Sequence, residues 1–144
     1  MRFNRLVLIR KKKKLTQMEI AKILSVERST YSCWETGKNT ITLNKLYELS
    51  NYYKISIDYI VGLSNKNEYF FSSQKINLIK LGKNLKEFRI RNNLKQKDII
   101  NLLEINKSTY SLYENGYITI QTAYLFKIAK KFKLSIDELI KKQT

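Results

Sequence analysis

The side chains of this chain that could do chemistry are hydrogen-bonding groups rather than the usual groups of metal and catalytic sites. The chain has no histidine, and Cys33 is its only cysteine. Zinc sites of the Cys/His kind, Cys-His and Ser-His-Asp catalysis and intrachain disulfides are therefore excluded. No cluster of Asp and Glu offers a general base, so we expect no metal, no cofactor and no enzyme activity. The polar groups gather instead at 15–20 and 27–37, and again at 94–99 and 106–116.

These stretches belong to an internal repeat. When the sequence is shifted by 79 positions, Leu6 to Val61 aligns with Leu85 to Ile140 without a gap, and 19 of 56 residues are identical. The chain is therefore two tandem copies of one unit. A unit of about 60 residues is near the lower size limit for a domain with its own core, so each copy must be compact and mostly helical.

The charge of the chain points to a polyanionic partner. Lys and Arg number 28 against 12 acidic residues, which gives a net charge of +16. Both copies are basic, so the charge is not that of a basic tail on a neutral domain. The N-terminus lacks the apolar core of a signal peptide, and no run is long enough to span a membrane. We expect a cytoplasmic, nucleoid-associated protein without membrane contact.

The elements that must position the polar groups are short helices. Apolar residues recur at helical spacing, and there is no proline and no sustained strand-like alternation. The pattern predicts an all-α chain with five helices per copy. Their expected ranges are 3–13, 17–24, 28–35, 43–53 and 57–62, then 78–92, 96–103, 107–114, 122–132 and 136–142. The expected domains are 1–63 and 78–144, joined by a linker at 64–77.

Local signals support the helix boundaries. Thr16 and Glu19 form a capping box for the second helix, whereas Lys95 at the same place in the second copy cannot cap. Gly37 and Gly116 end the third helix of each copy, where a positive φ is needed.

The linker contains three consecutive aromatic residues, Tyr69, Phe70 and Phe71. Leaving them in water would be costly. We expect them to pack on the other copy or on another chain, where they could seal a homodimer.

The repeated stretches resemble a known family. Leu15-Thr16-Gln17-x-Glu19-Ile20-Ala21, followed by Ser29-Thr30-Tyr31-Ser32-x-Trp34-Glu35-x-Gly37, is similar to the core of the Cro/repressor-like (XRE-type) helix-turn-helix family. The resemblance covers nearly the whole chain twice. It implies two lambda-repressor-like helix-turn-helix domains whose second and third helices form the motif, with the third helix in the major groove of DNA.

The resemblance assigns base reading to outward positions of the third helix. Arg28 could bind guanine O6 and N7 with two bonds, or it could contact phosphate. Asn106 is suited equally to capping its helix and to binding adenine, and Leu112 could meet a thymine methyl. The expected base-reading residues are Glu27, Arg28, Ser29, Ser32, Cys33, Asn106, Lys107, Ser108, Ser111 and Leu112.

The resemblance also implies phosphate contacts and two structural ion pairs. Gln17 and Gln96 are expected to be the first residues of the second helix in each copy. At this position the family binds a phosphate with a main-chain amide and a side chain. The ion pairs Arg10–Glu35 and Arg89–Glu114 would bridge the first and third helices. The expected phosphate contacts are Thr16, Gln17, Lys38, Asn39, Lys95, Gln96 and Tyr117.

The chain departs from the family pattern at one turn. The family usually has glycine between the two helices of the motif, for a left-handed residue, but here the position holds Ser25 and Glu104. The resemblance implies a sequence-specific regulator, a repressor that occupies a double-stranded DNA operator in a bacterial, phage or mobile-element operon. The alternatives are an RNA-binding protein, or a protein-directed inhibitor or antitoxin with a protein partner.

Overall fold

The computed structural model describes residues 1–70 and 75–141, and every regular element among them is an α-helix. The described chain divides into two compact units, Met1–Ser73 (unit 1) and Gln74–Thr144 (unit 2). The all-α prediction is therefore confirmed. Phe71 lies outside the described residues, so the expectation for it is not addressed.

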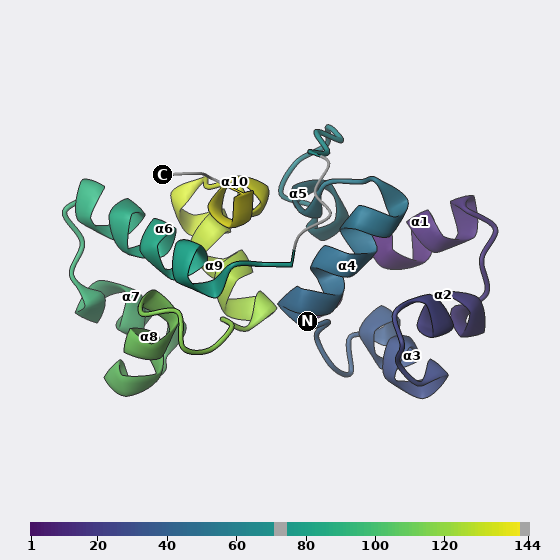
Figure 1. Ribbon diagram of the computed structural model, residues 1–144, viewed down its shortest axis with the longest axis horizontal. Coiled ribbons are helices and arrows are strands. Elements are labelled where there is room, and N and C mark those ends of the chain that lie inside the picture. The colour runs from purple at the N-terminus through teal and green to yellow at the C-terminus, as the bar shows by residue number, and fades with distance from the viewer. Residues whose placement is uncertain (71–74, 142–144) are drawn as a thin grey trace. The chain divides into compact units, whose positions relative to one another are not determined.

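Unit 1 contains five helices (Figure 1). They are α1 (Arg5–Lys12), α2 (Gln17–Ile23), α3 (Arg28–Thr36), α4 (Leu43–Tyr53) and α5 (Ile57–Val61). The first helix begins at Arg5 rather than at residue 3, because Phe3 is buried in the core before the helix starts.

Unit 2 repeats this order (Figure 1). Its helices are α6 (Leu78–Arg91), α7 (Gln96–Leu103), α8 (Lys107–Glu114), α9 (Thr122–Phe132) and α10 (Ile136–Lys141). The apolar residues of each unit that recur at helical spacing meet in one core. Ile20 and Tyr31 are fully buried in unit 1, and their repeat partners Ile99 and Tyr110 are buried in unit 2. This burial fixes which faces of α3 and α8 point outward.

Side-chain caps set the helix starts. The Thr16 hydroxyl accepts from the Glu19 N–H at 3.1 Å, and the Glu19 carboxylate accepts from the Thr16 N–H at 3.1 Å. This confirms the predicted capping box. At the equivalent place the side chain of Lys95 does not cap α7, but its N–H donates to Asp98 at 2.7 Å. One of the two hydrogen bonds of a capping box is therefore present in unit 2.

Left-handed residues end the helices. Gly37 and Gly116 follow α3 and α8 with φ of 84° and 74°, as predicted. Ser25 and Glu104 hold the turns between the motif helices with φ of 57° and 56°. Both turns therefore adopt the conformation that glycine usually provides, at a cost of about 1–2 kcal/mol for a residue with a Cβ.

The segment after α5 is held by unit 1 and does not behave as a free linker. Arg5 donates to the main-chain oxygens of Tyr59 and Ser64 at 2.7 and 2.6 Å and to the Asn65 side chain at 2.6 Å. Its guanidinium also lies 4.3 Å from the ring centroid of Tyr59. These contacts require that residues up to Asn65 follow α5 closely. The linker predicted at 64–77 thus begins with two residues that are hydrogen-bonded to α1.

Two further contacts extend this attachment. Asn67 Oδ1 accepts from the Ser56 N–H at 2.8 Å, and the Tyr69 hydroxyl donates to Asn51 Oδ1 at 3.1 Å. The Tyr69 hydroxyl is thus used within unit 1, and packing of the aromatic residues on the other copy or on another chain stays a prediction. Phe70 is 56% exposed.

Candidate nucleic-acid interface

One face of α3 carries exposed polar side chains, and its opposite face is buried in the core of unit 1. Glu27, Arg28 and Ser29 are exposed, and Ser32 and Cys33 are partly exposed one turn later. On the opposite face Tyr31 and Trp34 are 0% and 5% exposed and pack edge to face with ring centroids 6.0 Å apart. The predicted base-reading residues of unit 1 therefore share one outward surface.

The equivalent face of α8 has different chemistry. Lys107, Ser108 and Leu112 are exposed, and Ser111 is partly exposed. Asn106 caps the helix, because its Oδ1 accepts from the Thr109 N–H at 2.8 Å. The same oxygen accepts from the Ser108 hydroxyl at 2.8 Å. Of the two roles open to Asn106, the structure shows the cap.

A buried Arg–Glu pair braces this face in each unit. In unit 1, Arg10 Nε lies 2.8 Å from Glu35 Oε2 and Arg10 Nη2 lies 2.9 Å from Glu35 Oε1. Only 11% and 3% of the two side chains are exposed. Arg10 also donates to the Leu15 main-chain oxygen at 2.8 Å. The pair thus ties α1 and the α1–α2 turn to the last turn of α3.

Unit 2 repeats the arrangement. Arg89 Nε lies 2.8 Å from Glu114 Oε2, Nη2 lies 3.1 Å from Oε1, and Nη1 donates to the Leu94 oxygen at 3.0 Å. The side chains are 12% and 2% exposed. Charge-assisted, two-pronged contacts of this kind fix orientation as well as contributing energy. Both predicted ion pairs are therefore present.

Each pair also holds the glutamine that opens the preceding helix. Gln17 Nε2 donates to Glu35 Oε1 at 3.2 Å, and Gln96 Nε2 donates to Glu114 Oε1 at 3.2 Å. Phosphate contact was the only role predicted for these side chains from the sequence, and their bond to the ion pair was missed. The identity of Arg, Gln and Glu at three aligned positions of the repeat was the available signal. We refer to Arg10–Glu35–Gln17 and Arg89–Glu114–Gln96 as the two bracing triads.

The ionisation of unit 2's triad follows from its contacts. Burial alone would raise the pKa of Glu114, but hydrogen bonds from Arg89, Tyr110 and Gln96 outweigh it and bring that pKa below its ordinary value. The hydrogen bond to Glu114 raises the pKa of Arg89, as the bond to Glu35 does for Arg10. The Arg89–Glu114 pair is therefore charged at neutral pH.

The starts of α2 and α7 and the segments after α3 and α8 border these faces. The main-chain amides of a first helical turn have no partner within the helix, so they can bind an anion. Thr16 and Lys95 stand just before those turns and are exposed. Lys38, Asn39 and Tyr117, which follow the third helix of each unit, are also exposed. Every predicted phosphate residue thus lies at or beside a motif helix end.

Comparison with known proteins identifies the family. A helix-turn-helix (HTH_3) family model matches residues 6–60 and again residues 85–139, which together make up most of the chain. The chain belongs to the helix-turn-helix family. In that family's terms α2 with α3, and α7 with α8, are the two motifs, as the XRE-type resemblance predicted.

Two curated relatives come from Bacillus subtilis (strain 168). The uncharacterized HTH-type transcriptional regulator YobD is 36% identical over 62 residues, which are 43% of this chain and 55% of that protein. The uncharacterized HTH-type transcriptional regulator YqaE is 34% identical over 68 residues, 46% of this chain and 59% of that protein. The chain thus spans little more than half the length of these relatives. No solved structure matches.

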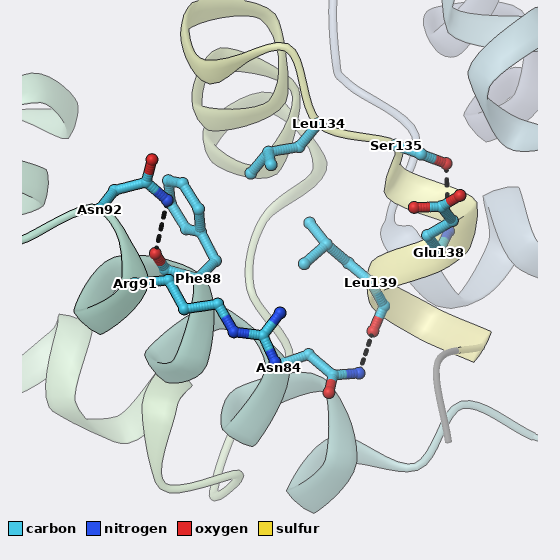
Figure 2. A pocket seen from close by; sticks show the side chains of 8 residues that line it. All are labelled: Asn84, Phe88, Arg91, Asn92, Leu134, Ser135, Glu138 and Leu139. Atoms are coloured by element: carbon cyan, nitrogen blue, oxygen red, sulfur yellow. Dashed lines mark hydrogen bonds between the residues drawn. The ribbon is translucent and has the colours of Figure 1, made fainter. Parts of the chain in front are cut away.

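Unit 2 of this helix-turn-helix protein also has a pocket of about 240 Å³ away from the motif face. Figure 2 shows Asn84, Phe88 and Arg91 of α6 on one side of it and Ser135, Glu138 and Leu139 on the other. Asn84 Nδ2 donates to the Leu139 oxygen at 2.7 Å across its base. None of the predicted recognition residues lines this pocket.

Residues 1–70 and 75–141 lack two further features. They contain no group of three or more His, Cys, Asp or Glu side chains that could hold a metal ion. None of their helices is both long and apolar enough to cross a membrane.

Proposed function

We propose that this helix-turn-helix protein is a sequence-specific, double-stranded DNA-binding transcriptional regulator. The observation that carries the proposal is the bracing triad, present in both units. It holds an outward polar helix face and the start of the neighbouring helix as one rigid surface. A rigid surface of this kind suits a ligand whose phosphates and bases are themselves fixed relative to one another.

The proposed roles follow the geometry of each unit. Main-chain amides at the start of α2 and α7 bind phosphate. The Gln17 and Gln96 side chains, held by the triads, are positioned to add a second contact. Lys38, Asn39 and Tyr117 flank the backbone after the recognition helices. The exposed face of α3, with Arg28 at its start, enters the major groove and reads bases.

We further propose that the protein acts as a repressor of a bacterial, phage or mobile-element operon by occupying its operator. The two recognition faces differ, so one chain reads two unlike half-sites as a single-chain pseudo-dimer. Along the chain, eight Cα–Cα steps lead from Phe70 to Leu78, the first residue of α6. Fully extended, they span about 26–29 Å. Such a tether favours half-sites on adjacent turns, about 34 Å apart.

Binding of the full chain to fluorescent duplexes tests the proposal. We expect affinity for random double-stranded DNA to fall steeply with salt, because lysines displace counterions from phosphates. Selection from fragments of the source genome should then yield a duplex bound about 10³-fold more tightly or better. Equal or stronger binding to single-stranded RNA, or affinity that does not change with salt, would refute the DNA assignment.

The spacing of the half-sites tests the single-chain arrangement. Inserting 10 base pairs between the half-sites adds one turn of DNA, so both half-sites still lie on the same face of the duplex. The insertion should abolish the contribution of one half-site to the binding affinity. Sedimentation of the complex should show one chain per operator. A stable dimer of the free protein at micromolar concentration, lost in Phe70→Ser, would instead support assembly through the linker aromatics.

A further inference from the structure

The recognition faces of the two units differ in chemistry at aligned positions. In unit 1 the outward face carries Arg28 and Cys33, and in unit 2 the same positions hold Lys107 and Leu112. Leu112 is 39% exposed on α8. Leu112 and Ser108 are four residues apart and share one side of the helix. An apolar side chain therefore occupies the middle of a surface that is polar in unit 1.

The polar groups on the α8 face are already engaged within unit 2. The Ser108 hydroxyl and the Thr109 N–H both donate to Asn106 Oδ1 at 2.8 Å. The Ser111 hydroxyl lies 3.5 Å from Gln96 Oε1, to which it donates. A two-bond contact from Asn106 to adenine would require the helix cap to break. The side chains of Lys107 and Leu112 can contact DNA without breaking any of these bonds.

The starts of the unit 2 motif helices are cationic. Lys95, Lys97 and Lys107 are exposed at or just before the first turns of α7 and α8, with Asp98 as the acidic group among them. Lysine is depleted at the centres of protein interfaces, whereas it is the ordinary partner of DNA phosphate. Tyr117 and Ile118 follow the end of α8 and are 73% and 41% exposed.

The major groove offers one apolar group, the C5 methyl of thymine. We infer that unit 2 reads its half-site through the contact of Leu112 with thymine methyl groups, whereas unit 1 reads hydrogen-bonding groups through Arg28. This inference rests on the proposed function and specifies the substrate of the second motif. It requires a thymine-containing half-site for unit 2.

Replacement of thymine by deoxyuridine tests the inference, since it removes only the methyl group. The probe is a duplex selected from a random library by the full chain, with each thymine replaced in turn. The unit 2 half-site is the half whose base preferences survive Arg28→Ala. We expect at least one replacement there to weaken binding about fourfold, the effect of burying one methyl-sized group. Replacements in the other half should have no comparable effect.

Protein variants connect the effect to Leu112. The Leu112→Ala variant should bind the thymine and uracil duplexes with equal affinity. That affinity should match the affinity of the wild type for the uracil duplex. Leu112→Met keeps an apolar side chain of similar size and should retain the discrimination. Cys33→Ala, the matched change in unit 1, should leave the response to uracil unchanged.

Three results would overturn the inference. The first is uracil discrimination below about 1.5-fold at every position of the unit 2 half-site. The second is a Leu112→Ala variant that weakens binding to both duplexes by the same factor. The third is a Leu112→Ala variant with unchanged DNA affinity but altered sedimentation, which would make this face a protein interface. Failure of the proposed function is distinct, because it would appear as absence of salt-dependent binding to any duplex.

Discussion

Replacement of Glu114 by Gln tests whether the bracing triad stabilises unit 2. Gln has nearly the same volume, but it removes the charge and puts a donor where Arg89 and Gln96 need acceptors. Because only 12% of the Arg89 side chain is exposed, its charge would stay largely buried without a counter-charge. Removing one partner of such a pair costs about 3–5 kcal/mol.

This cost is large relative to the stability of a small domain. At roughly 0.05–0.15 kcal/mol per residue, a unit of about 70 residues has about 3.5–10 kcal/mol in total. Each kcal/mol lowers the Tm of a domain of this size by about 4–8 °C. We therefore expect the Tm of unit 2 to fall by at least about 12 °C in Glu114→Gln.

The chain contains an internal reporter that separates the two units. Its single tryptophan, Trp34, lies in unit 1 and is 5% exposed. Tryptophan fluorescence thus follows unfolding of unit 1, while far-UV circular dichroism follows both units. Glu114→Gln should split the dichroism transition and leave the fluorescence transition in place, and the matched variant Glu35→Gln should shift the fluorescence transition. A loss below about 1 kcal/mol in Glu114→Gln would refute the argument, as would equal shifts of both signals.

The pH dependence provides a second signature of the same triad. The pKa of Glu114 is lower in the folded state than its ordinary value. The stability that the Glu114 carboxylate contributes to the folded state is therefore fully present above the pKa of the unfolded state, about 4.3. It is lost as the pH falls through the lower pKa of the folded state. Unfolding measured between pH 7 and pH 3 should show a smaller loss of stability in Glu114→Gln than in the wild type.

Four further changes address the interface and the turns. Lys38→Ala should weaken binding to all duplexes alike and reduce the slope of log affinity against log salt by about 1; an unchanged slope would rule out a phosphate contact there. Arg28→Ala should relax base discrimination by about 1–3 kcal/mol in one half-site only, and equal losses in both halves would contradict separate reading by the two units. Glu104→Gly, at φ of 56°, should stabilise unit 2 by about 0.5–1 kcal/mol in urea unfolding, since the relief of strain exceeds the entropy that glycine restores to the unfolded chain. Ser25→Gly is the matched change in unit 1, and destabilisation in either variant would show that the turn depends on the side chain.

The helices could be predicted because their signals are local. Apolar spacing sets the buried face of each helix, and residues such as Thr16 and Gly37 mark starts and ends through bonds or backbone angles within a few positions. The left-handed turns at Ser25 and Glu104 needed the resemblance as well, because neither residue type favours a positive φ. These expectations match the structure.

The contacts that were missed join positions far apart in the chain. Arg5 reaches Ser64, and Tyr69 reaches Asn51, so a polar segment that reads as a flexible linker is attached to unit 1. Sequence spacing carries no information about such pairs until the fold places them together. The same reason explains the bond from Gln96 to Glu114, which spans 18 positions.

The internal repeat shows which positions of the motif can change. The residues of the bracing triads are the same in both copies, since a change to Arg, Gln or Glu in a triad would leave the other two buried or unpaired. The exposed positions of the recognition face differ, with Arg28 against Lys107 and Cys33 against Leu112. These exposed positions lie outside the bracing triads, so a substitution there breaks no triad contact and the faces can diverge while the scaffold stays constant. Two different specificities on one chain are the result we expect from this division, and in the proposed single-chain arrangement the linker limits the distance between their targets.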